Sequence, residues 1–496
     1  MAKKTINKEL TGAQDLYNFL FEACNIIRGP VSQDNFKDYI TPLLYYKRIS
    51  DVYDEETEEA LISSGGDKEY ASLPEQHRFV IPDGCHWQEV RERTENLGAA
   101  IVGAMRQIEI ANPDTLYGVL SMFSSQKWTN KAILNDSKIR DLIEHLSKRE
   151  LGNKDYPADL MGDAYEILLK KFADDSKAQA GEFYTPRSVV RLLVHILDPQ
   201  PGETIYDPAC GSGGMLIEAI RYMHDDFLCC GSIFGQEKNV VNAAIAKMNL
   251  FLHGASDFNV MQGDTLRDPK ILQGGNIAKF DCVIANPPFS LENWGATEWS
   301  SDKYKRNIYG TPSDSCGDYA WIQHMICSMV SGQGRMAVVM PQGILFRNQE
   351  TEIRKQLVES DLIEAVVTLG DKLFYGTGLS PCFLIIRRMK PAHHSGRILM
   401  IDGSKILTQK RAQNILEEND IDRLYSLYQN YSDEEDYSRI VTLQEIRDKE
   451  YNLSPNRYVV YHKEEIRPYA EVLAEFKHAY EEVKRLEEEF SLLINA

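Results

Sequence analysis

Asn286, Pro287, Pro288 and Phe289 place a planar amide, two prolines and an aromatic ring at four consecutive positions. Adjacent prolines restrict the backbone and remove two N–H donors, so the carbonyl oxygens around them remain available as hydrogen-bond acceptors. Together with the Asn286 side-chain oxygen they would form a rigid pair of acceptors for an amino group. The Phe289 ring offers a flat apolar face for stacking on a planar ring such as a nucleobase. The four residues therefore predict a catalytic site that holds a planar amine.

A glycine-rich loop from Asp207 to Gly214 is the second candidate feature. Gly211, Gly213 and Gly214 allow the backbone to pass close to a ligand, and Ser212 is a small residue among them. The helix expected after the loop would direct its first N–H groups at a carboxylate or phosphate. The loop lacks the GxGxxG spacing of dinucleotide-binding folds, which disfavours a nicotinamide-dependent dehydrogenase. A cofactor-binding loop is the prediction, and a tight turn without a ligand is the alternative.

Two acids follow the next two apolar segments of the chain. Glu237 could accept two hydrogen bonds from a ribose diol, and Asp264 could accept one from the exocyclic amine of an adenine. Each acid alone would more often be a solvated or helix-capping residue. Ligands of open α/β sheets bind at the carboxyl ends of strands, so sites at the ends of successive strands favour one shared nucleoside pocket.

The elements that would position these residues alternate between short apolar runs and helical stretches, a pattern typical of a mostly parallel α/β sheet. The predicted strands are 204–206, 232–236, 260–262, 280–285, 336–340, 363–369, 382–386 and 398–401. The predicted crossover helices are 215–223, 240–252, 319–330 and 349–359, and a charged helical region is expected around 408–422. The connection 370–380 is too short and glycine-rich for a crossover helix, so the strands it joins should pair antiparallel at one edge of the sheet.

Four parts are predicted along the chain. Residues 1–171 show helical spacing of apolar residues without β-alternation and should form an all-helical domain. Residues 172–405 should form the α/β domain with the candidate site, and residues 406–467 a charged mixed extension. Residues 468–496 should form an amphipathic helix, whose narrow apolar seam packs either on this chain or on another subunit.

The composition limits the classes of function. A chain of 496 residues, 43% apolar and 26% charged, fits a globular protein with at least two domains. Its net charge of −19 has the wrong sign for holding nucleic acid unaided, so a partner, or a basic surface confined to one face, would have to supply positive charge. The nine cysteines form no CxxC pair, which predicts reduced thiols in a cytoplasmic protein and no metal centre. No run of about 18 apolar residues occurs, so membrane spanning and secretion are not expected.

These residues, in this order, resemble the adenine-specific DNA methyltransferases that use S-adenosylmethionine. Residues 286–289 match that family's [DNS]PP[YFW] motif in the variant associated with N6 of adenine, with phenylalanine in place of the commoner tyrosine. Residues 207–214 are similar to the loop that holds the methionine part of the cofactor, and Glu237 to the acid that holds its ribose. The order of motifs is that of the gamma group. Its additional cofactor-binding segment resembles Glu182, Phe183, Tyr184, Thr185, Pro186 and Arg187.

The resemblance extends beyond these motifs. Residues 39–52, 373–382 and 451–454 resemble stretches of the modification subunit of type I restriction-modification systems. This implies an S-adenosylmethionine-dependent methyltransferase fold after a helical domain, and a cytoplasmic enzyme that methylates N6 of a flipped-out adenine in double-stranded DNA. The implied partners are a specificity (S) subunit, joined by two copies of this chain, and a restriction (R) subunit. A methyltransferase for ribosomal RNA or a protein glutamine amide is the alternative, because the same acceptors suit those amines. A non-catalytic scaffold protein with this fold is a further alternative.

Overall fold

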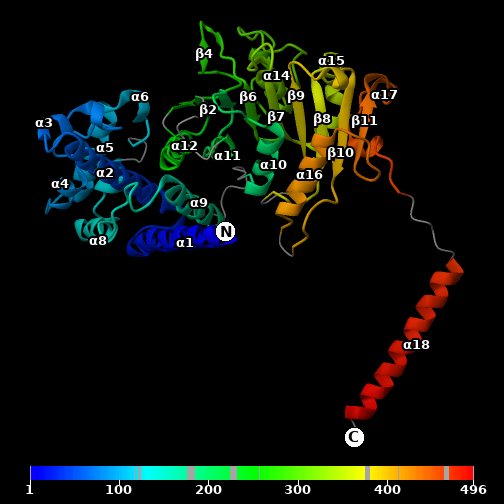
Figure 1. The fold of residues 1–496 in the computed structure, drawn as a ribbon, viewed down its shortest axis with the longest axis horizontal. Coiled ribbons are helices and arrows are strands. Elements are labelled where there is room, and N and C mark those ends of the chain that lie inside the picture. Colours follow the sequence, from blue (N-terminus) through cyan, green and yellow to red (C-terminus); the bar gives the residue numbers. More distant parts are fainter. Residues whose placement is uncertain are drawn as a thin grey trace.

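A nine-stranded sheet lies at the centre of the molecule, with helices on both of its faces (Figure 1). The computed structural model describes residues 2–116, 118–120, 125–175, 185–223, 232–255, 257–374, 380–410, 413–462 and 469–494. The sheet order is β11-β10-β8-β9-β7-β6-β1-β2-β3. Its strands are β1 (Ile205–Asp207), β2 (Ile233–Glu237), β3 (Phe258–Gln262), β6 (Cys282–Ala285), β7 (Arg335–Pro341), β8 (Ile363–Leu369), β9 (Pro381–Arg387), β10 (Arg397–Gly403) and β11 (Ser438–Thr442). A separate short hairpin pairs β4 (Leu272–Gln273) with β5 (Asn276–Ile277).

Most neighbouring strands run parallel, as the alternation of apolar runs and helices predicts. β9 pairs antiparallel with both β7 and β8, and β11 pairs antiparallel with β10. The antiparallel pair expected from the short connection is confirmed, but it lies inside the sheet. It does so because β8 has its other neighbour in β10, and β11 then forms the antiparallel edge.

Alternate residues of the strands face two separate cores. On β7, Ala337 and Val339 pack with helices α10 (Arg187–Leu197), α11 (Gly214–Met223) and α16 (Glu418–Asn430). Met336 and Val338 face the other way, toward α14 (Asp318–Cys327) and α15 (Thr351–Glu359). A sheet with both faces buried needs strands that are apolar throughout, which is why they read as continuous apolar runs. The short helices α13 (Ala296–Trp299) and α17 (Leu443–Asp448) complete this part of the chain.

A group of helices precedes the sheet and lies beside it in Figure 1. They are α1 (Ala2–Ile27), α2 (Lys37–Ser63), α3 (Lys68–Ala71), α4 (Trp87–Arg91), α5 (Leu97–Ala111), α6 (Pro113–Leu116), α7 (Ser125–Thr129), α8 (Asp136–Leu146) and α9 (Ala158–Asp175). Their shared core includes residues of α12 (Val240–Leu252), a crossover helix of the sheet. The Phe251 ring packs edge-on against Tyr45 of α2, with 5.1 Å between ring centroids. The helical region and the sheet are therefore joined through α12.

The predicted charged helix around 408–422 is wrong in position. Thr408 and Ile415 form an isolated antiparallel bridge, and the helix there is α16, which begins at Glu418. A capping box between Glu417 and Asp420 sets this start, because each side chain bonds the other residue's backbone N–H. The predictions also missed β11, although its residues lie within the segment 406–467. The four-part division of the chain stays a prediction.

The last helix, α18 (Tyr469–Ile494), extends away from the rest of the molecule in Figure 1. Its seam residues Phe476, Tyr480, Val483, Leu486 and Phe490 are all exposed. In the structure these seam residues do not pack on the rest of the chain, which was one of the two alternatives. None of the helices in the described ranges is both long and apolar enough to cross a membrane.

Candidate active site

Asn286 follows the last residue of β6, so the buried central strand sets the position of its side chain. The amide Nδ2 donates a hydrogen bond to Thr185 Oγ1 at 2.7 Å. The amide oxygen is buried and has no hydrogen-bond partner among the described residues. A buried acceptor left without a donor costs roughly 1–3 kcal/mol, so this oxygen is suited to a donor that arrives with a ligand. The bond to Thr185 also joins two motifs that lie 101 positions apart in the sequence.

The residues after Asn286 form the rim of the site. Pro287 is buried, Pro288 is exposed, and the half-buried Phe289 ring lies 6.3 Å from the ring of Phe374 at an angle of 56°. Next in the chain, Ser290 adopts a left-handed backbone conformation, with φ of 50°. Such a conformation is uncommon for a residue other than glycine and needs support from its surroundings.

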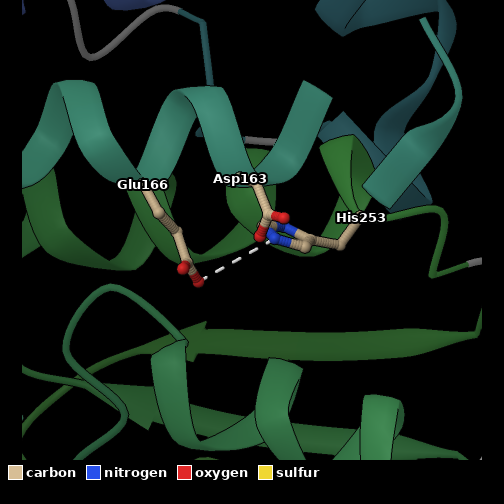
Figure 2. Close-up of side chains that lie close together, drawn as sticks. All are labelled: Asp163, Glu166 and His253. Carbon is tan, nitrogen blue, oxygen red and sulfur yellow. Dashed lines mark ion pairs between the residues drawn. The ribbon is translucent and has the colours of Figure 1, made fainter. Parts of the chain in front are cut away.

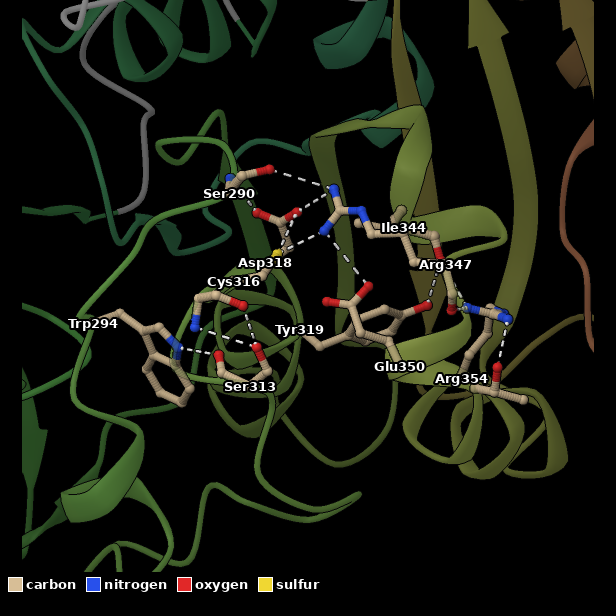
Figure 3. A network of polar contacts seen from close by, with 12 residues as sticks. Ser290, Trp294, Ser313, Cys316, Asp318, Tyr319, Ile344, Arg347, Glu350 and Arg354 are labelled. Carbon is tan, nitrogen blue, oxygen red and sulfur yellow. Dashed lines mark hydrogen bonds and ion pairs between the residues drawn. The ribbon is translucent and has the colours of Figure 1, made fainter.

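A network of polar contacts supplies that support (Figure 3). The Ser290 backbone N–H donates to Asp318 Oδ1 at 2.7 Å, and the Asp318 side chain is completely buried at the start of α14. Arg347, in the segment after β7, donates to Asp318 Oδ2 at 2.9 Å. Arg347 also lies 3.6 Å from Glu350, and its backbone carbonyl accepts from Arg354 Nη1 at 2.9 Å. The loop after Phe289 is thus held against the ends of two other elements.

The glycine-rich loop lies at the carboxyl ends of the neighbouring strands β1 and β2. Gly211 and Gly213 have φ of 54° and 84°, conformations that side chains disfavour. The Gly211 N–H donates to Glu237 Oε2 at 3.0 Å, and the Asn239 N–H donates to Glu237 Oε1 at 2.7 Å. Asp207 is buried at the end of β1, and burial raises its pKa to about 8.

A cavity of about 90 Å³ joins the two motifs. Its walls include seven of the residues predicted from the sequence: Thr185, Arg187, Asp207, Gly211, Ser212, Gly214 and Asn286. Pro186 and Gly213 are adjacent in the chain to lining residues, and Glu237 contacts the loop as described. Asp264 does not line this cavity; its carboxylate pairs with Lys238 at 2.9 Å and accepts from the Arg267 N–H at 3.2 Å. Glu182, Phe183 and Tyr184 lie outside the described residues, as do residues 375–379 of the segment that resembles type I modification subunits.

Comparisons with known proteins give two family matches. Residues 156–466 match the model of the family described as N-6 DNA Methylase, and residues 16–146 match the HsdM N-terminal domain. The chain belongs to the N-6 DNA methylase family.

Individual relatives show the same similarity over 70% to 90% of the chain. The chain is 34% identical to the type I restriction enzyme MjaVII methylase subunit of Methanocaldococcus jannaschii, over 90% of this chain and 78% of that protein. It is 31% identical to the HindI methylase subunit of Haemophilus influenzae, over 70% of this chain and 76% of that protein. The crystal structure of a type I restriction-modification methyltransferase subunit from Streptococcus thermophilus superimposes with a TM-score of 0.78 at 26% identity. That match covers 91% of this chain and all of that one.

Membership of this methylase family confirms the resemblance, the fold class and the adenine-specific DNA methyltransferase activity that the sequence implied. It favours DNA over the ribosomal RNA or glutamine amide that the acceptor pair left open. The roles of individual site residues and the domain boundaries stay predictions.

The sequence reading missed several residues of the cavity wall: Glu166, Val190, Ala209, Cys210, Met215 and Glu218. Ala209 and Cys210 lie within the glycine-rich loop and could have been included. Glu166 belongs to α9, which the sequence assigned to a separate helical domain. Glu218 stands one turn after Gly214 on α11, where an acid also fits a solvated helix face. No local pattern marks either glutamate.

A larger hollow, of about 840 Å³, lies along α15 and residues 447–457. None of the residues predicted for catalysis or cofactor binding lines it. Its walls include the exposed cations Lys355, Arg447, Lys449 and Arg457, together with exposed Glu352 and Glu450. We assign the chemistry to the smaller cavity because Asn286 lines it, and the Asn286 side-chain oxygen has no partner within the described ranges.

Proposed function

We propose that this chain is the modification subunit of a type I restriction-modification system, and that it transfers a methyl group from S-adenosylmethionine to N6 of an adenine flipped out of duplex DNA. The buried Asn286 oxygen, which has no donor among the residues that the structure describes, lies at the wall of the cavity and carries this proposal. An adenine N6 amine would supply such a donor.

The residues of the site fit the cofactor. The positive-φ glycines let the loop backbone approach a ligand, and Glu237 is held by two backbone N–H groups at the end of β2, where it can receive a ribose diol. S-adenosylmethionine, when bound, supplies a methyl group on a positively charged sulfur. Thr185, Asp207 and the loop would hold the cofactor beside Asn286.

The chain's own residues then orient the amine. The Asn286 side-chain oxygen and the Pro287 carbonyl would accept the two N6–H bonds, which directs the nitrogen lone pair into the cavity. Phe289 would stack on the base and return about 1–3 kcal/mol of the cost of flipping. No general base is required before transfer, because the methylated amine is acidic and loses its proton afterwards. Positioning and electrostatics therefore account for most of the rate enhancement.

Partners follow from charge and from exposed surface. With a net charge of −19, the chain needs local cations for DNA, and the hollow beside α15 gathers several exposed ones. We propose that this hollow binds DNA phosphates.

The exposed seam of α18 would dock on a specificity subunit that joins two copies of this chain, and a restriction subunit would complete the complex. The proposed site of action is the cytoplasm.

The test is an Asn286→Ala variant of the full chain, purified with the partners that copurify. Methyl transfer from labelled S-adenosylmethionine to DNA should be abolished, because the amine loses its main acceptor. Cofactor affinity, measured by calorimetry, should change by less than about threefold. Asn259→Ala, at an exposed position of β3, is the matched control and should behave as the wild type. Near-normal turnover of Asn286→Ala would contradict the assignment.

A further inference from the structure

One wall of the cofactor cavity carries charged groups from three different helices. Glu166 comes from α9, Arg187 begins α10, and Glu218 lies on α11. The Arg187 Nη1 atom is 3.6 Å from Glu166 Oε2, and Arg187 Nε is 3.5 Å from Glu218 Oε2. These separations exceed ordinary charge-assisted hydrogen bonds of about 2.7–2.9 Å. Arg187 is therefore near both glutamates but does not form a short ion pair with either of them.

A second layer of side chains lies behind Glu166 (Figure 2). The His253 ring is fully buried, and its Nδ1 is 2.8 Å from the Asn249 carbonyl, so Nδ1 carries the proton. Its Nε2 has no hydrogen-bond partner among the described residues and lies 3.8 Å from Glu166 Oε1. A Cβ at Gly162 would stand 2.2 Å from Nε2, so only glycine lets α9 pack against this ring. Burial lowers the His253 pKa to about 4, which keeps the ring neutral.

Asp163, Glu166 and His253 place three possible metal-ligand atoms within 4.8 Å of one another. Cations already occupy this neighbourhood, however. Arg221 Nη2 lies 2.6 Å from Asp163 Oδ1, and Arg187 Nη1 lies 3.5 Å from the same oxygen. Arginine neutralises Asp163, so a metal ion would have to displace a short ion pair. We therefore do not assign a metal ion to the cluster; His253 and Arg187 instead position Glu166 at the cavity wall.

Four carboxyl groups around Arg187 share three arginines. Asp163, Glu166 and Glu218 each lie within 3.6 Å of Arg187, and Arg221 pairs with Asp163. Arg191 lies 3.7 Å from Glu218 and also pairs with Glu418. A ligand end that carries both an ammonium and a carboxylate fits this pattern, because the glutamates can accept from the ammonium while an arginine pairs with the carboxylate. The cavity runs from this wall to Asn286.

We propose that Glu166, with Glu218, binds the α-ammonium group of the methyl donor, while Arg187 pairs with its carboxylate. The helical region that precedes the sheet would thereby contribute a residue to the cofactor site. The inference rests on the proposed function through the identity of S-adenosylmethionine as the ligand.

A pH dependence follows. Burial raises the Glu166 pKa to about 7, while Arg187 opposes this shift and Asp163 adds to it. Glu218 and the neutral His253 are the other titratable groups that face Glu166. Since an ammonium binds the ionised carboxylate, binding should release a proton near neutral pH, and cofactor affinity should tighten several-fold from pH 6 to pH 8. This dependence should disappear in Glu166→Gln.

The test compares two ligands of the full chain by calorimetry. S-adenosylmethionine has the amino-acid end, and 5′-methylthioadenosine is the matching nucleoside thioether without it. Glu166→Gln should lose about tenfold or more in affinity for S-adenosylmethionine, because a charge-assisted bond is lost, and less than about twofold for 5′-methylthioadenosine. Glu218→Gln is a second variant with the same expected pattern. Glu59→Gln, the same substitution at an exposed position of α2 that does not line the cavity, is the control and should keep both affinities.

Equal losses for both ligands would indicate a purely structural role for Glu166 and overturn the inference. Unchanged binding of S-adenosylmethionine by both glutamine variants would also overturn it, while leaving the proposed function intact. A wild-type chain that binds neither ligand would instead refute the proposed cofactor and the inference with it. Thermal unfolding of each variant separates misfolding from loss of contact.

Discussion

Asp318→Asn should detach the loop after Phe289 from α14 and from the segment after β7. The buried Asp318 carboxylate accepts from the Ser290 N–H and pairs with Arg347, whose side chain is one quarter exposed. Asparagine can still accept from Ser290, but its NH₂ group would face the Arg347 guanidinium. Breaking a buried ion pair costs about 3–5 kcal/mol. Partial exposure of Arg347 and its remaining neighbour Glu350, at 3.6 Å, reduce this to about 2–3 kcal/mol of unfolding free energy.

The functional effect should be separate from the cofactor site. Loss of the contact frees the loop that holds Phe289, and misplacement by about 1 Å can cost roughly 100-fold in rate, so we expect turnover to fall roughly 10- to 100-fold. S-adenosylmethionine affinity should stay within about threefold. Urea unfolding, methyl transfer and calorimetry measure the three quantities.

Asp15→Asn provides the control for the Asp318 experiment. It removes an ion pair to Arg149 at 2.7 Å in which the Asp15 side chain is 66% exposed. Its cost should be below about 1 kcal/mol, with normal turnover. The reasoning fails if Asp318→Asn unfolds and turns over like this control. A matching drop in cofactor affinity would indicate general damage and also count against it.

Three further predictions concern the base, the glycine-rich loop and the hollow. Phe289→Ala should weaken capture of the flipped base, seen as a smaller 2-aminopurine fluorescence change, with cofactor affinity unaltered; an unchanged signal would count against stacking. Because burial raises the Asp207 pKa to about 8, folding takes up a proton and wild-type stability falls as pH rises from about 4 to 8. Asp207→Asn should therefore be more stable than wild type by roughly 2–4 kcal/mol at pH 8.5 and nearly equal at pH 4, by chemical denaturation; equal stability at both would refute the shift. Removing Lys355 and Arg457 together should lower the slope of log affinity for duplex DNA against log salt by about 1.8, whereas an unchanged slope would exclude the hollow.

The alternation of short apolar runs with helical stretches predicted the sheet well, because both of its faces are buried and its strands are apolar throughout. The strand 363–369 and the helix 240–252 were predicted with the bounds that the structure has. β11 was missed because Ser438–Thr442 is a short edge strand with a polar residue at each end. α16 was misplaced because charged residues from Lys410 onward have helical propensity, whereas the bridge between Thr408 and Ile415 delays the helix start.

The site was predictable where a motif contained the chemistry and not where the fold brought distant residues together. Asn286 and the glycine-rich loop could be found because each motif follows its own strand. The bond between Asn286 and Thr185 and the position of Glu166 depend on how α9 and α10 pack, which no local pattern encodes. The same is true of Asp318 and Arg347, which meet across 29 positions of the chain.

α12 belongs to two of the three cores, that of the preceding helices and that on one face of the sheet. Ile245, Met248 and Phe251 pack with the preceding helices, and Leu250 packs against the sheet. The Asn249 side chain donates to the Ser212 carbonyl in the glycine-rich loop at 3.0 Å. The single helix α12 thus contacts the helical region on one side and the glycine-rich loop on the other. Removal of the helices that precede the sheet would expose an apolar stripe on α12, and the remaining chain would be prone to aggregate. In the intact protein, any partner that shifts the helical region would also shift the glycine-rich loop, for which we propose binding of the methyl donor.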